Sequence, residues 1–277
     1  MLADLHIHTR FSDGSYTIKD ALKKAGLRGI DVVSFTDHDT VDQTIPALKE
    51  SRIAGVKVIP GIEMSGYDFK RKRKIHILGY GYAPEASAIK TLCFPLLKKR
   101  HNNTLNQIDI LNKAGYAVTE KEVYNVAGKN TSCLYKQHIM QLLILKKQTT
   151  SIYGALYHKL FKHSGICSMD IEYGDARDAV IAILNDGGLP VLAHPGQTDS
   201  WEIIPELVDI GLAGIELYHQ DHCKNDYSKI LGAAKKYNLF TTGGSDDHGI
   251  FGSSHKMGDI RAPFGSIKEM RRKLHII

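Results

Sequence analysis

Short apolar segments that alternate with stretches of helical spacing constrain the fold of this chain more than any other feature. Most of them are uninterrupted apolar runs, as strands buried on both faces of a parallel sheet require. Between the first two, Thr17 and Asp20 form a capping signal for a helix that ends near Gly26 and Gly29. The alternation predicts an α/β fold whose strands form a closed or nearly closed parallel barrel. The expected strands are Ala3–His8, Val32–Thr36, Val56–Ile62, Ile75–Tyr80, Pro190–Ala193, Gly214–Tyr218 and Leu239–Gly243.

The alternation is interrupted between the fourth and fifth expected strands. Residues 85–169 contain no convincing strand, but they show helical spacing at Leu92 and Leu96 and again at Ile139 and Leu143. We therefore expect a barrel domain built from residues 1–84 and 170–277, with residues 85–169 as a helical insertion. Barrels of this kind carry their chemistry at the C-terminal ends of the strands, so the insertion is expected to cap that face.

The charge balance favours anionic ligands. The formal net charge is +6 and the sequence pI is about 8.9, which gives the protein a moderately positive field. The densest basic run, Lys70 to Lys74, lies between two expected strands. We interpret it as a solvated hairpin turn, with contact to nucleic-acid phosphates as the alternative.

Two further features bear on where the protein acts. No apolar run approaches the ~20 residues needed to cross a bilayer, so we expect a cytoplasmic protein without a membrane partner. The four cysteines are widely separated and form no C-x-x-C pair. This spacing indicates neither a disulfide framework nor a thiolate zinc site.

The first expected strand carries two histidines, His6 and His8, in the segment Asp-Leu-His-Ile-His-Thr that begins at Asp4. A strand alternates its side chains between two faces, so residues two apart point to the same side. Both imidazoles can therefore share one metal ion. Such a pair is more often structural when it stands alone, and other ligand-type residues are needed to make it a metal site.

Those other residues lie at the ends of the later strands, and six of the seven expected strands deliver at least one. Each has an ordinary structural explanation by itself, such as a turn residue or a buried histidine. Their joint placement at one end of a barrel instead indicates a catalytic metal site. Imidazole and carboxylate ligands together suit Mn, Fe or Zn. The further ligand-type residues are Asp13, His38, Glu63, His76, His194, Asp246 and His248.

With these motifs the chain resembles the polymerase and histidinol phosphatase (PHP) family over nearly its whole length. The resemblance implies a distorted (β/α)7 barrel and nine metal ligands. His6, His8, Glu63 and Asp246 are expected to hold one ion and to carry the catalysis. The motifs are Asp4-Leu-His-Ile-His-Thr with Ser12-Asp-Gly, Thr36-Asp-His-Asp, Gly61-Ile-Glu, His194-Pro-Gly and Gly244-Ser-Asp-Asp-His.

The same resemblance implies two more metal positions. Glu63 is expected to bridge to a second ion that His76 and His194 also bind. A third ion is expected at Asp13, His38 and His248. Some family members have a histidine where this chain has Asp13, so the third position is expected to accept a harder cation such as Mn or Mg.

Within the family the chain resembles single-domain phosphoesterases that act on small nucleotides. In that subgroup a Gly-Arg-Pro-His segment grips phosphate, and the matching stretch here is Tyr135-Lys136-Gln137-His138. Lys136 would replace the arginine as a point charge without its bidentate fork, and His138 is retained. Arg100 is a second expected phosphate ligand. Tyr218 and His222, after the sixth strand, are expected to line the pocket.

These features together predict a phosphoric monoester hydrolase of the PHP type with two or three divalent cations. Our best expectation is conversion of a nucleoside 3',5'-bisphosphate to the nucleoside 5'-monophosphate and phosphate, through attack by a metal-bound hydroxide. Histidinol-phosphate hydrolysis and trimming of short RNA from the 5' end are the enzyme alternatives. A metal-loaded nucleotide-binding module is the non-enzyme alternative. The expected partners are a small phosphorylated substrate or a short oligonucleotide, without an obligate protein partner.

Overall fold

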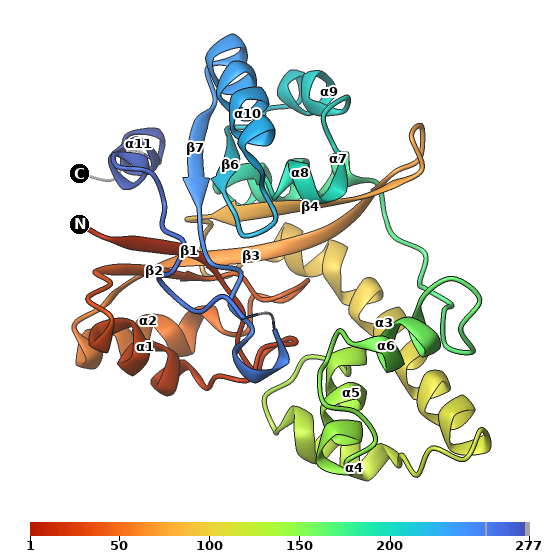
Figure 1. Ribbon diagram of the computed structural model, residues 1–277. Coiled ribbons are helices and arrows are strands. Elements are labelled where there is room, and N and C mark those ends of the chain that lie inside the picture. Colours follow the sequence, from red (N-terminus) through yellow and green to blue (C-terminus); the bar gives the residue numbers. More distant parts are fainter. Residues whose placement is uncertain (253, 275–277) are drawn as a thin grey trace.

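Figure 1 shows a computed structural model of the chain, which describes residues 1–252 and 254–274. Within these residues seven strands form one sheet in chain order, from β1 to β7. Ile7 and Asp247 form a parallel bridge that brings the two edges together, so the sheet is a nearly closed barrel and the predicted fold class is confirmed. The strands are β1 (Ala3–Ile7), β2 (Val32–Phe35), β3 (Lys57–Asp68), β4 (Arg73–Tyr80), β5 (Leu189–Leu192), β6 (Gly214–Tyr218) and β7 (Phe240–Gly243).

The expectation of an entirely parallel barrel is wrong for β4, which runs antiparallel to both β3 and β5. Only a short turn over residues 69–72 joins β3 to β4. A parallel connection needs a crossover of a dozen or more residues, whereas a turn of this length permits only a hairpin. The predicted hairpin turn in the basic run is thereby confirmed. Its side chains are ion-paired rather than simply solvated, since Arg71 contacts Asp68 and Glu206.

Helices cover the outside of the barrel. The side chain of Thr17 accepts a hydrogen bond from the backbone of Asp20 at 3.1 Å, so the predicted N-terminal cap of the first helix is confirmed. No helix in the described ranges is long and apolar enough to cross a bilayer. The helices around the barrel are α1 (Ile18–Leu27), α2 (Thr44–Ala54), α7 (Ala176–Asn185), α8 (Pro195–Thr198), α9 (Ile204–Asp209), α10 (Lys224–Tyr237) and α11 (Ser266–Lys273), with a short 3-10 turn η1 (Gly249–Phe251).

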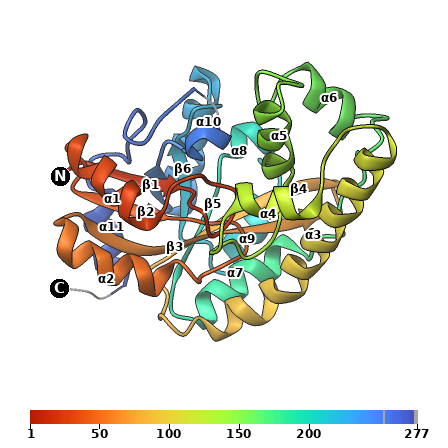
Figure 2. The ribbon, with the colours of Figure 1, turned by 90° about the horizontal axis from the view of Figure 1, so that it is seen from below.

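The segment between β4 and α7 is helical, with α3 (Ser87–Lys113), α4 (Glu120–Ala127), α5 (Lys136–Leu145) and α6 (Ala155–Phe161). In Figures 1 and 2, α4, α5 and α6 gather beside the far part of α3, away from both chain ends. Their apolar side chains form a core of their own around Leu111 and Ile139. The first part of α3 belongs to the barrel instead, because Ile89 and Cys93 pack in its main core. The division at residues 85–169 therefore stays a prediction.

Candidate metal centre

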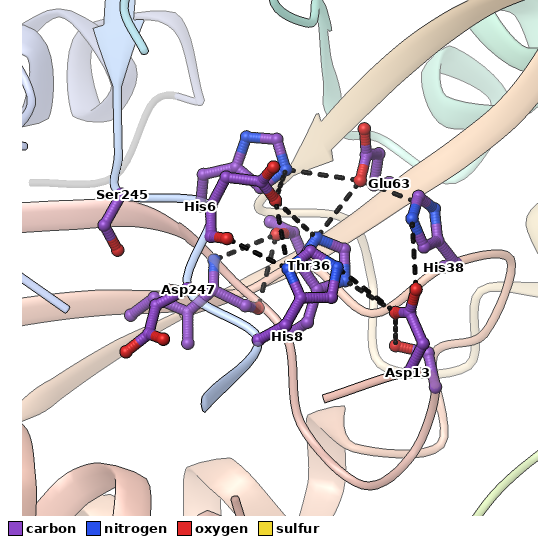
Figure 3. Close-up of polar contacts among 12 residues, drawn as sticks. His6, His8, Asp13, Thr36, His38, Glu63, Ser245 and Asp247 are labelled. Carbon is purple, nitrogen blue, oxygen red and sulfur yellow. Dashed lines mark hydrogen bonds and ion pairs between the residues drawn. The ribbon is translucent and has the colours of Figure 1, made fainter. Parts of the chain in front are cut away.

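Glu63 lies at the middle of the site, on β3 and almost completely buried. Its Oε2 atom is 3.2 Å from Nε2 of His6, 3.2 Å from Nε2 of His8 and 3.4 Å from Nδ1 of His38. Figure 3 shows these three imidazoles turned toward the one carboxylate. Because the strand and loop ends that carry them are adjacent in the barrel, residues far apart in the chain converge on a single oxygen.

The other oxygen of Glu63 contacts two more imidazoles. Oε1 is 2.7 Å from Nδ1 of His76, on β4, and 2.8 Å from Nε2 of His194, which follows β5. The backbone of His194 has φ of 23°, a left-handed conformation that is strained for a residue with a side chain. One carboxylate thus connects two sets of histidines, as a ligand that bridges two ions would.

Asp246 completes the first set of predicted ligands, with His6, His8 and Glu63. Its Oδ1 atom is 3.4 Å from Nε2 of His6 and 3.2 Å from Nε2 of His8. Asp246 follows β7, and its backbone N–H donates to the carbonyl of His6 at 2.8 Å. This hydrogen bond closes the barrel at the point where the two chain segments meet, so closure of the fold also places the ligand.

Asp13 organises a third set on the outer side of His8. The Oδ1 atom of Asp13 lies 3.4 Å from Nε2 of His248 and 3.6 Å from Nδ1 of His8, and its Oδ2 atom is 4.0 Å from Nε2 of His38. The rings of His8 and His248 stack with centroids 3.9 Å apart. This arrangement presents three imidazoles from different parts of the barrel to one carboxylate.

The residues present fit a multinuclear metal centre. Several buried imidazole nitrogens have no hydrogen-bond partner, among them Nδ1 and Nε2 of His8, Nδ1 of His38 and Nδ1 of His194. A buried polar atom without a partner is costly unless something else satisfies it. Imidazole and carboxylate donors are those of Mn, Fe and Zn sites. The ligand-type groups close enough to share an ion are His6/His8/Glu63/Asp246, His8/Asp13/His38/His248, His38/Glu63/His76 and His6/Glu216/His219.

The electrostatics of the site show why these side chains need one another. Burial alone would raise the pKa of Glu63, but the surrounding imidazoles, led by His38 and His76, hold it well below its usual range. Burial would likewise lower the pKa of His8, yet the nearby carboxylates of Asp246 and Glu63 raise it to about 10. For His38, burial dominates and lowers the pKa to about 4. The carboxylates and protonated imidazoles of the cluster therefore stabilise one another, and bound cations could take the place of the protons.

Four buried aspartates beside the ligands hold the ligand-bearing loops and were not predicted as functional. Asp37 is an example, because its carboxylate accepts bonds from the backbone and hydroxyl groups of both Thr9 and Ser12 at 2.7 to 3.1 Å. It thereby fixes the turn that carries Asp13. Each of the four lies within two residues of a predicted ligand, and this proximity was the available signal. They are Asp4, Asp37, Asp39 and Asp247.

A cavity of about 340 Å³ opens beside the ligands, and Asp13, His38 and His76 form part of its wall. The predicted phosphate ligands Arg100 and Lys136 line the same cavity. Arg100 is anchored by Asp39 at 2.7 Å and by the Ser65 hydroxyl at 3.0 Å. The remaining lining residues are Lys74, Asn103, Thr104, Tyr135, Gln137, Tyr157, Lys162, Asp170, Ile171, Tyr173 and Gln197.

Two lysines of this cavity, Lys74 and Lys162, were not predicted as site residues. Lys74 was assigned to the solvated turn, but it already belongs to β4 and lies two residues before His76. The strand period of two places both on one face, so the signal was present in the sequence. Lys162 follows α6 directly, and no local pattern there distinguishes it from other exposed lysines.

The structure does not bring His138, Tyr218 and His222 into the cavity wall. Nδ1 of His138 accepts a hydrogen bond from the backbone of Tyr135 at 3.1 Å. His222 uses both ring nitrogens, since Nδ1 donates to the Leu217 carbonyl and Nε2 accepts from the Gly196 backbone. Tyr218 is 40% exposed and is not among the residues that line the cavity. Their expected contacts with substrate remain untested predictions.

The strand for which no ligand was predicted, β6, supplies Glu216 at the back of the centre. Its Oε1 atom is 3.0 Å from Nδ1 of His6. His219 follows three residues later, with Nε2 3.4 Å from Oδ2 of Asp246. A glutamate in the middle of an otherwise apolar strand was the signal that could have identified this position.

Several known proteins are similar to this chain. A family model described as the PHP domain matches residues 4–187. A phosphoribosyl 1,2-cyclic phosphate 1,2-diphosphodiesterase of Eggerthella lenta is 46% identical to this chain. The alignment covers 95% of this chain and 100% of the diesterase. A 3',5'-nucleoside bisphosphate phosphatase of Chromobacterium violaceum is 25% identical, covering 88% and 86% of the two chains. A 5'-3' exoribonuclease of Haemophilus influenzae is also 25% identical, covering 88% and 89%.

A solved structure extends the fold comparison. The crystal structure of a protein from Bifidobacterium adolescentis, described as a candidate metal-dependent phosphoesterase, superposes with a TM-score of 0.90. The superposition covers 98% of this chain and 96% of the Bifidobacterium chain, and the two sequences are 23% identical. At this identity the similarity supports the barrel fold alone.

Proposed function

The chain belongs to the PHP domain family, and we propose that this metal-dependent phosphoesterase hydrolyses a cyclic phosphodiester on a phosphorylated sugar, acting in the cytoplasm. The observation that carries the proposal is the 46% identity with the Eggerthella lenta diesterase along its entire length. The bisphosphate phosphatase and the exoribonuclease are 25% identical over a smaller share of the chain. A phosphoribosyl 1,2-cyclic phosphate is therefore the preferred substrate.

The cavity supports a substrate that carries a second phosphate away from the reacting one. Lys136 lies within a group of cations that also includes Lys74, Lys162 and Arg100. Burial lowers the pKa of Lys136; Asp170 opposes this shift, and the other three cations add to it. Like charges held together at the wall of a cavity are stabilised by a bound anion. The cation group would hold the phosphate of the sugar while the ester lies against the metal ligands.

The chemistry divides between the two ends of the cavity. The nine predicted ligands would hold divalent cations, which would supply charge neutralisation at phosphorus and a water molecule of lowered pKa. Cleavage of one P–O bond adds the oxygen of water to phosphorus and leaves an alcohol on the sugar. Lys136 and Arg100 orient the distal phosphate, and this positioning makes attack effectively intramolecular. Tyr135 hydrogen-bonds the His38 backbone at 3.2 Å and holds α5 against the centre.

A substrate panel tests this proposal. The Mn-loaded protein would be assayed with phosphoribosyl 1,2-cyclic phosphate, adenosine 3',5'-bisphosphate, a 5'-phosphorylated RNA dinucleotide and histidinol phosphate, by phosphorus NMR and phosphate release. We expect kcat/KM to be highest for the cyclic phosphate, by on the order of 100-fold or about 2.7 kcal/mol. A higher kcat/KM for any of the other three substrates would overturn the proposal.

The bisphosphate reaction is the second candidate, and the tyrosines of the cavity favour it. Tyr135, Tyr157 and Tyr173 all line the wall, and an aromatic side chain can stack on a nucleobase. Two phosphates and a base would then use the metals, the cations and the tyrosines together. Release of the 3'-phosphate from the bisphosphate at the highest kcat/KM of the panel is the result that would select this candidate.

Replacing Lys136 by methionine is expected to weaken binding of the distal phosphate without affecting the chemistry at the metals. A hydrogen bond to a charged group contributes roughly 1.5–3 kcal/mol, so we expect KM to rise roughly 10- to 100-fold for the phosphoribosyl substrate. For ribose 1,2-cyclic phosphate, which lacks the second phosphate, kcat/KM should change little. Steady-state kinetics on both substrates provide the measurement.

Lys113→Met is the matched control, because Lys113 is exposed at the end of α3 and pairs with Asp109. It should leave both sets of constants unchanged. Equal losses on the two substrates in the Lys136 variant would show that Lys136 does not recognise the distal phosphate.

A further inference from the structure

Glu216 is a buried carboxylate whose position the metal ligands alone do not explain. It lies on β6 with no exposed surface, and burying an ionised carboxylate is unfavourable unless it is fully hydrogen-bonded. The nine ligands predicted from the sequence do not include it. Its burial directly behind the metal centre therefore requires a structural or functional reason.

Both oxygens of Glu216 are used, and each contacts a different part of the centre. Oε1 lies 3.0 Å from Nδ1 of His6, and Oε2 accepts the backbone N–H of His194 at 2.9 Å. A carboxylate can only accept, so Nδ1 of His6 must carry the proton in this pair. Nε2 of His6 is then the nitrogen that faces Glu63 and Asp246, with its lone pair available to a metal ion.

The contact to His194 serves the second set of ligands. His194 has the strained backbone noted above, with φ of 23° and ψ of 60°. The hydrogen bond from its N–H to Glu216 helps to hold that conformation, and its Nε2 atom reaches Glu63 at 2.8 Å. One side chain thereby supports a ligand from each of the two sets that Glu63 joins.

A fourth metal site is the competing explanation, because ligand atoms of His6, Glu216 and His219 lie within 4.8 Å of one another. The hydrogen bonds disfavour it. Nδ1 of His219 accepts the Asp221 backbone N–H at 3.2 Å, which leaves the proton on Nε2, facing Asp246. With both Glu216 oxygens also in use, a cation at this place would have to displace existing bonds.

We infer that Glu216 is a positioning residue that fixes the tautomer of His6 and the backbone of His194, so that the first and second sets of ligands bind their ions together. In many metal sites a carboxylate accepts the second ring N–H of a metal-binding histidine. Replacing that carboxylate commonly lowers metal affinity 10- to 100-fold. Glutamine at this position would set an N–H group against one of the two donors. The inference rests on the metal-dependent function proposed above.

The test measures metal binding rather than turnover. The full chain carrying Glu216→Gln would be stripped of metal and titrated with Mn²⁺, with free Mn²⁺ followed by electron paramagnetic resonance. We expect the affinity of the tightest site to fall roughly 10- to 100-fold, with the far-ultraviolet circular dichroism unchanged. Asp68→Asn is the matched control, because Asp68 is also buried but pairs with Arg71 in the β3–β4 hairpin. Its Mn²⁺ affinity should remain that of the natural chain.

A second measurement needs no variant. In the Zn²⁺-loaded natural chain, nitrogen-15 NMR of the histidine rings should show His6 protonated at Nδ1 and coordinated through Nε2. The inference would be overturned by coordination of His6 through Nδ1 or by unchanged Mn²⁺ affinity in the Glu216→Gln variant. It would also be overturned if anomalous scattering showed an ion bound by Glu216 itself. If the chain binds Mn²⁺ as expected but hydrolyses none of the phosphoesters, the proposed function fails while the role of Glu216 stands.

Discussion

Glu63→Gln is expected to reduce kcat about a thousandfold, which corresponds to ~4 kcal/mol in activation free energy. The carboxylate contacts five imidazoles, three through one oxygen and two through the other. An amide of the same size keeps one acceptor but loses the charge, and its NH2 group would point at imidazoles that should face an ion. Bound metal should therefore fall together with activity, as elemental analysis of the purified variant would show.

The matched control for this variant is Glu202→Gln. Glu202 is an exposed carboxylate that pairs with Arg71 on the surface, so its replacement should leave kcat and metal content unchanged. A Glu63→Gln protein that retains its metal and more than a tenth of its activity would show that Glu63 does not connect the ligand sets.

Removal of metal by a chelator is expected to abolish hydrolysis, with less than one part in a thousand of the rate remaining. The predicted ligands include imidazole nitrogens that are buried without partners, and a bound cation would satisfy them. Divalent cations contribute several kcal/mol of charge stabilisation to phosphoryl transfer. Addition of Mn²⁺ to the stripped protein should restore turnover, and the comparison of stripped and reloaded samples is the measurement.

The same experiment has a readout in stability. An ion that binds only the folded chain stabilises it by about 2.7 kcal/mol when its free concentration is 100 times Kd. We therefore expect the Tm of the stripped protein to be lower and to rise with added Mn²⁺. Persistent turnover by a sample shown to be metal-free would refute metal dependence, whereas a lower Tm with unaltered activity would indicate a purely structural ion.

Much of the site could be predicted because it follows from local patterns. His6 and His8 share a face through the strand period of two, and Glu63 lies on β3 beside them. The family motifs place the other ligands at strand ends, and the structure gathers all nine around Glu63, Asp13 and Asp246. The assignment of particular ligands to particular ions remains a prediction.

The fold could be predicted in class but not in every strand direction. The parallel arrangement follows from apolar runs separated by helices, and it holds for β1, β2 and β3 and for β5, β6 and β7. The residues of β4 do not indicate its direction, and only the length of its connection to β3 excludes a crossover. The reversal brings Lys74 and His76 to the cavity, where one contributes charge and the other faces Glu63.

The candidate metal ligands and the strand face on which each lies could be read from the chain, because both depend on residue type and on a short repeat. The partners of these residues came from the three-dimensional fold alone. Glu216 supports His6 from 210 positions away, and Lys136 shares its cavity with Lys74 through the packing of α5 against the barrel. Hydrogen-bond partners, charge and burial depend on distances in space, and closure of the barrel sets those distances.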